Sequence, residues 1–244
     1  MQCPRAGRSF VLVSLALLLC GLATLLAPAG APRGPVIATV NGEWSAKFWQ
    51  WLYSVPLADN PAFDPTGDDA SNGQPPGSVF FLCGTFTLAE SSPGVILGQA
   101  DRTIRVPYGK TFVFPLVNAE FDNLGLEPPL STAELRAKAA DAINHTVALA
   151  CAIDGVAIPE ENLFAYFRVA SPKFNYFLPD NNIAGVPSQL VKGAVSDGYY
   201  VAVSNLSPGR HTISWYAALD LREEFGFVFI QDIRYTINVL PRRQ

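Results

Sequence analysis

The feature that most constrains the fold is a series of short apolar runs separated by turn residues, which begins at Thr146. Strand residues alternate between the two faces of a sheet, and Ile233, Tyr235, Ile237 and Val239 follow this period of two. Many short strands joined by turns are typical of a β-sandwich or jelly roll. The 20 Pro and 19 Gly disfavour long helices, so the chain is predicted to be mainly β.

Several strands can be placed by their apolar residues and flanking turns. Single strands are predicted at 79–83, 163–169 and 227–239. Pairs of strands joined by short turns are predicted at 104–107 with 111–117, at 147–153 with 156–158, and at 194–203 with 211–217.

Two short helices are predicted to pack on this β structure. Residues 41–55 form an apolar helix that ends at Pro56, and residues 131–143 form a second helix whose Ser131 and Glu134 match a capping box. No linker or internal repeat divides the sequence. Residues 30–244 are therefore predicted to form a single β-sandwich, jelly-roll-like domain.

The N-terminal segment has the pattern of a secretory leader. Arg5 and Arg8 precede an uncharged apolar stretch over 10–27, and Ala27-Pro28-Ala29 supplies small residues for cleavage. Residues 1–29 are predicted to be a signal peptide. An uncleaved signal anchor is the alternative, because the apolar stretch reaches about the lower length limit for a membrane span. In that case the leader would be the protein's only contact with the membrane.

Export predicts a secreted or extracytoplasmic protein, in the periplasm or cell envelope. Cys3 and Cys20 leave with the leader, and Cys83 and Cys151 remain in an oxidising compartment. These two residues form either a disulfide or two buried free thiols, and the sequence leaves both alternatives open.

Charge and histidine content exclude several functions. The formal net charge is -4, and loss of Arg5 and Arg8 with the leader makes it more negative, so nucleic-acid binding is disfavoured. His145 and His211 are the only histidines, which nearly excludes a multi-histidine metal site. The sequence also lacks the HExxH, CxxC, GxSxG, P-loop and GxGxxG motifs.

The most informative polar cluster follows the apolar strand at 112–117. If the strand continues, Asn118, Glu120 and Asp122 lie on one face with neighbours about 7 Å apart. Glu120 and Asp122 are candidate catalytic carboxyl groups for glycan cleavage, and Asn118 is a candidate ligand-binding residue. The same oxygens suit Ca²⁺. The plain alternative is a strand that ends in a solvated turn.

Two further candidates lie nearer the N-terminus. Asp64, Asp68 and Asp69 occupy a Gly-containing loop and could ligate Ca²⁺, the only cofactor predicted; the alternative is a set of Asx turns in a solvated loop. Trp49 and Tyr53 lie away from the main apolar face of their helix. They could form an exposed stacking platform for a sugar, or they belong to a helix that is buried on two sides.

Six stretches of the sequence stand out together: WQWLYSVP (49–56), NPAFDPTG (60–67), FFLCGTF (80–86), VPYGKTFVFPLVNAEFDN (106–123), AVSDGYYVAV (194–203) and LSPGRHTISW (206–215). Together they resemble a family of uncharacterised exported bacterial proteins of predicted β-sandwich type. The resemblance implies export and a β-sandwich, but it brings no known activity and assigns no functional residue. Proteins of this family often carry cysteines near the positions of Ser71 and Ile104. If those cysteines pair, this chain has lost the disulfide, which puts in doubt a rigid tie between the loop at 56–78 and the strands at 104–117.

These observations favour a non-catalytic exported protein that binds a glycan or another envelope component. A glycan-active hydrolase or lyase that uses Glu120 and Asp122 is the first alternative, and a structural envelope protein is the second.

Overall fold

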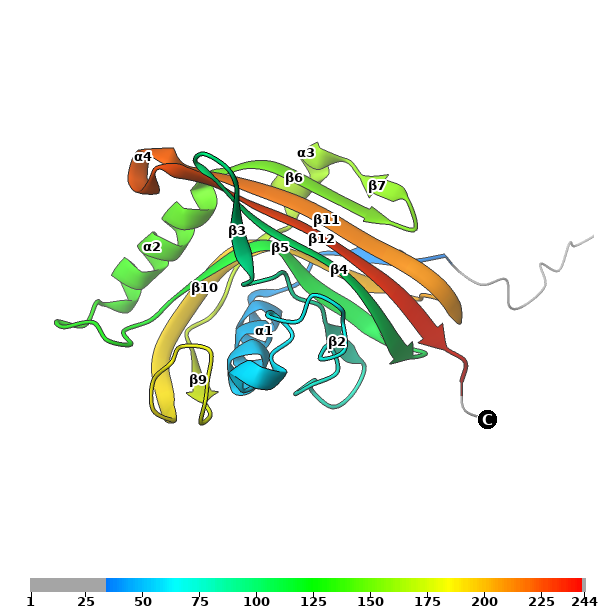
Figure 1. The fold of residues 1–244 in the computed structure, drawn as a ribbon, viewed down its shortest axis with the longest axis horizontal. Coiled ribbons are helices and arrows are strands. Elements are labelled where there is room, and N and C mark those ends of the chain that lie inside the picture. Colours follow the sequence, from blue (N-terminus) through cyan, green and yellow to red (C-terminus); the bar gives the residue numbers. More distant parts are fainter. Residues whose placement is uncertain (1–33, 243–244) are drawn as a thin grey trace, which may run out of the picture. The chain divides into compact units, whose positions relative to one another are not determined.

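The computed structural model describes residues 34–242, and the predicted signal peptide lies outside the described residues. The chain is a mainly β sandwich of two six-stranded sheets (Figure 1). The first sheet contains β1 (Val36–Ala38), β2 (Val79–Phe81), β5 (Thr111–Phe121), β8 (Arg168–Ala170), β9 (Phe174–Leu178) and β10 (Gln189–Ser204). The second contains β3 (Leu88–Ser92), β4 (Val95–Pro107), β6 (Thr146–Ile153), β7 (Val156–Ile158), β11 (Gly209–Leu221) and β12 (Phe227–Leu240).

The main hydrophobic core lies between the two sheets. The predicted alternation of β12 is confirmed, because Ile233, Tyr235, Ile237 and Val239 are all buried in this core. Trp215 of β11 stacks between Phe114 and Tyr235, with ring centroids 4.8 Å and 5.7 Å away. Burial of such aromatic side chains contributes about 2–3 kcal/mol each, which makes this stack a major support of the sandwich.

One predicted strand pair is confirmed and two are wrong. β6 and β7 form a hairpin in which Asp154 and Gly155 have φ of 51° and 79°, as a tight hairpin turn requires. β4 instead pairs with β3 and β12, while β5 pairs with β2 and β10. β10 and β11 likewise lie in different sheets. Each of these turns connects a strand of one sheet to a strand of the other sheet. Such a turn uses the same residue types as a hairpin turn.

The strand predicted at 163–169 is also wrong. The segment forms helix α3 (Glu160–Tyr166), followed by β8. Leu163 and Phe167 are buried at helical spacing, and the Glu160 side chain accepts a hydrogen bond from the backbone N–H of Leu149. Periodicity alone does not distinguish a short apolar run in a helix from one in a strand.

The two predicted helices are present. α1 (Gly42–Ser54) packs on the outer face of the first sheet with β9, around a second hydrophobic core. α2 (Thr132–Asn144) begins with the predicted capping box, in which Ser131 and Glu134 exchange hydrogen bonds. The short helix α4 (Arg222–Phe225) lies near the end of α2 (Figure 1). Among the described residues, no helix is long and apolar enough to span a membrane.

The loop at 56–78, which includes a short 3₁₀ helix (Leu57–Asp59), is tied to β4 without a disulfide. The fully buried Arg102 donates from Nε to the Asp64 carbonyl at 2.7 Å, and Thr103 donates to the Thr66 carbonyl at 2.8 Å. Cys83 and Cys151 are both buried and free, so the free-thiol alternative holds. They lie in different hydrophobic cores.

Candidate functional site

A β-bulge in β5 determines where the predicted polar cluster points. Val117 pairs with Tyr199 and Pro115 pairs with Tyr200, so Leu116 is an extra residue on β5. Leu116 and Val117 consequently both face the core between the sheets. The bulge therefore reverses the alternation and turns the following even-numbered residues, Asn118 among them, toward α1 and β9.

Glu120 is half-buried and lies against α1. The Tyr53 hydroxyl donates to Glu120 Oε2 at 2.8 Å, whereas Oε1 is buried with no hydrogen-bond partner among the described residues. Burial, together with the nearby charge of Asp122, raises the pKa of Glu120 to about 8. At neutral pH this side chain is therefore mainly a neutral carboxylic acid.

Asp122 completes a compact cluster with Tyr53, Glu120 and Tyr176, which we call the carboxyl–tyrosine cluster. The Tyr176 hydroxyl donates to Asp122 Oδ2, and the backbone N–H of Leu124 donates to Oδ1 at 2.5 Å. The rings of Tyr53 and Tyr176 stack with centroids 4.3 Å apart. Burial raises the pKa of both tyrosines, so their hydroxyls stay protonated donors.

Asp122 lies near Glu120 and its charge contributes to the raised pKa of Glu120, but no hydrogen bond joins the two carboxyl groups. Inverting glycosidases hold their two carboxyl groups roughly 6.5–9.5 Å apart to leave room for water. Here each carboxyl group accepts instead from a tyrosine hydroxyl, Glu120 from Tyr53 and Asp122 from Tyr176.

Trp49 does not form the exposed platform predicted for it. Only 5% of Trp49 is exposed and Tyr53 is half-buried, so the alternative of a helix buried on two sides is correct. The prediction failed because β9, which packs against α1, was not recognised in the sequence. Trp49 stacks on Tyr53 at 5.3 Å. The Trp49 indole N–H lies near the Tyr200 hydroxyl, but it makes no hydrogen bond among the described residues.

A small pocket of about 60 Å³ lies beside Trp49, where α1 meets the β5 bulge and β12. Such a volume holds a few water molecules or part of a small ligand. Thr85 and Gln231 exchange two backbone–side-chain hydrogen bonds at 2.9 Å, so these polar groups are satisfied. The lining includes Phe48, Trp49, Thr85, Phe86, Asn118 and Gln231.

The structure thus brings together residues from two of the predicted sets. Asn118 donates to the Tyr200 hydroxyl at 2.9 Å and lines the same pocket as Trp49. Sequence reasoning missed Tyr176, Tyr200 and Gln231. Nothing local marks them, because they reach the site through strand pairing over long sequence separations.

Asp64, Asp68 and Asp69 of the acidic loop do not line this pocket, and hydrogen bonds between the loop's own residues hold it. The Asp64 carboxylate accepts hydrogen bonds from the backbone of Thr66, Gly67 and Asp69 and from the Thr66 hydroxyl, at 2.7–2.9 Å. Burial alone would raise the pKa of Asp64, yet these hydrogen bonds hold it below its ordinary value. Asp68 Oδ2 lies 2.9 Å from the same Thr66 hydroxyl, and Asp69 accepts from Asn72. The loop is thereby explained without an ion, and Ca²⁺ binding stays a prediction.

Neither the comparison with protein-family models nor the comparison with curated proteins finds a match for this chain. The resemblance to a family of uncharacterised exported proteins therefore stays a prediction.

Proposed function

We propose that this protein is an exported, non-catalytic β-sandwich that binds a glycan in the pocket beside Trp49. One observation carries the proposal: the Trp49 indole N–H is a buried donor without a hydrogen-bond partner among the described residues, and Trp49 lines the pocket. A buried unsatisfied donor costs about 1–3 kcal/mol, which a ligand oxygen placed there would recover.

The pocket walls suit one part of a carbohydrate. Phe48, Leu52 and Phe86 supply apolar surface for the C–H face of a sugar, while Trp49 and Asn118 supply polar groups at its edge. The β5 bulge shapes one wall, and bulges are over-represented next to binding and active sites. Given its volume, the pocket takes one substituent or ring edge of a glycan rather than a whole oligosaccharide.

Replacing Trp49 with phenylalanine is expected to weaken glycan binding about tenfold. Phenylalanine keeps a six-membered aromatic ring but lacks the indole N–H, so one hydrogen bond of about 1.4 kcal/mol is lost. The measurement is isothermal titration calorimetry with the tightest ligand from an immobilised panel of mono- and oligosaccharides.

The matched control for this substitution is Trp215→Phe. Trp215 also has a buried, unpartnered indole N–H, but it lies outside this pocket. Its substitution should leave the affinity unchanged in folded protein. If no glycan of the panel binds the wild-type protein, or if both variants lose affinity equally, the proposal is rejected.

The raised pKa of Glu120 favours one other function, glycan cleavage with Glu120 as general acid and Asp122 as its partner. This alternative predicts that the wild-type protein turns over a glycan and that Glu120→Gln and Asp122→Asn abolish turnover while the protein stays folded. An absence of turnover across the glycan panel would remove the alternative.

A further inference from the structure

We propose that Asp141, His145 and Glu224 form a binding site for a divalent metal ion of the zinc class, separate from the pocket beside Trp49. Each residue offers one ligand atom, and these three atoms lie within 4.8 Å of one another. His145 Nε2 lies 3.5 Å from Glu224 Oε1, close to the separation of two ligands on one tetrahedral zinc ion.

Two elements that are distant in sequence build this group. Asp141 and His145 are four residues apart at the end of α2, so they lie on the same helix face. Glu224 comes from α4, which follows β11 directly. The backbone N–H of Asp220 donates to the His145 carbonyl at 2.8 Å, which fixes the end of α2 against this segment (Figure 1).

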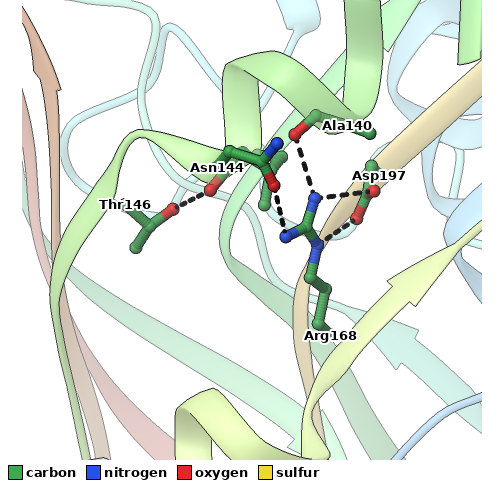
Figure 2. A network of polar contacts seen from close by, with 6 residues as sticks. Ala140, Asn144, Thr146, Arg168 and Asp197 are labelled. Atoms are coloured by element: carbon green, nitrogen blue, oxygen red, sulfur yellow. Dashed lines mark hydrogen bonds and ion pairs between the residues drawn. The ribbon is translucent and has the colours of Figure 1, made fainter. Parts of the chain in front are cut away.

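The surrounding charges favour a cation. The carbonyl end of a helix carries partial negative charge, and α2 has no basic residue in its last turn. The nearest arginines are committed to other partners. Arg222 is paired with Asp220, and Arg168 holds Asp197 through two hydrogen bonds of 3.1 Å while it binds Ala140 and Asn144 (Figure 2).

The ligand set indicates the class of metal. One imidazole nitrogen with two carboxylate oxygens suits zinc, manganese or iron better than calcium, which prefers oxygen ligands alone. Asp141 and Glu224 are exposed, so water can complete the coordination. The Asp64 carboxylate is less available to a metal ion, because its oxygens already accept four hydrogen bonds.

The test is titration of the folded protein with ZnCl₂ by isothermal calorimetry, with CaCl₂ as the comparison. We expect one zinc ion per chain, at least tenfold weaker binding for Asp141→Asn and for Glu224→Gln, and loss of binding for His145→Gln. Zinc should also raise the melting temperature of the wild-type protein and not that of His145→Gln, because an ion bound only to the folded state stabilises it.

Asp154→Asn is the matched control, because His211 Nδ1 and Asp154 Oδ2 form a second histidine–carboxylate pair, 2.7 Å apart, with no third His, Cys, Asp or Glu ligand among the described residues. This variant should bind zinc like the wild-type protein. The proposal is overturned if the wild-type protein binds no zinc, if Asp154→Asn removes the binding, or if binding survives His145→Gln.

Discussion

Replacing Arg102 with methionine is expected to lower the free energy of unfolding by about 3–5 kcal/mol, because it leaves several buried acceptors without donors. The Arg102 Nη1 donates to the Cys83 carbonyl and to the Tyr235 hydroxyl, both at 2.7 Å, and to the Gly84 carbonyl at 3.1 Å. With the Nε bond to Asp64, one side chain joins the loop at 56–78, the segment after β2, and two strands of the second sheet. Urea denaturation at neutral pH measures the change.

Arg105→Met is the matched control, because Arg105 lies on the same strand but faces solvent. Its substitution should change stability by no more than about 0.5 kcal/mol. A loss below about 1 kcal/mol for Arg102→Met would show that Arg102 does not hold these segments together.

Raising the pH from 5 to 9 is expected to destabilise the wild-type protein through Glu120. The pKa of Glu120 is about 8 in the folded chain, against an ordinary value of 4.5. Between these values the folded state keeps a proton that the unfolded state has lost, so stability falls as the pH rises. The contribution of this proton is complete below pH 4.5 and is lost as the pH passes 8.

Glu120→Gln should remove most of this dependence, because a glutamine amide resembles the protonated carboxyl and can still accept from Tyr53. At pH 9 the variant is expected to be more stable than the wild-type protein by about 2–4 kcal/mol, less than the full shift implies since Glu120 is only half-buried. Urea denaturation at pH 5, 7 and 9 tests this, with Glu43→Gln, an exposed glutamate of α1, as the control. Equal pH dependence in the wild-type protein and Glu120→Gln would contradict the prediction.

Features determined by neighbouring residues could be predicted from the sequence. The capping box at Ser131 and the hairpin turn at Asp154-Gly155 each depend on a few adjacent side chains, and both are present. The alternation of β12 also held at Ile233, Tyr235, Ile237 and Val239, because this part of the strand keeps one face against the core.

Features set by distant pairing could not be predicted. The turn at Tyr108–Lys110 looks like a hairpin turn, and only the partners of β4 and β5 reveal that it joins two sheets. The bulge at Leu116 also has no local signature, yet it decides that Asn118 faces α1. The buried position of Trp49 depends on β9, whose presence beside α1 follows from its pairing with β10.

Hydrogen bonds, and no disulfide, connect the loop at 56–78 to β4. The predicted family resemblance put in doubt a rigid connection between this loop and β4, but Arg102 and Thr103 supply one through hydrogen bonds. Such a tie forms without oxidation, so folding of this region should not depend on a reducing or oxidising buffer.

The position of β12 has a consequence for the order in which the sandwich can assemble. β12 follows every other described strand in the sequence, yet it lies between β4 and β11 in the second sheet. Until residues 227–240 insert, both neighbours present open edges and the sheet remains in two halves. Late closure of this kind makes folding slow, since the pairing of β12 with β4 depends on contacts between distant segments.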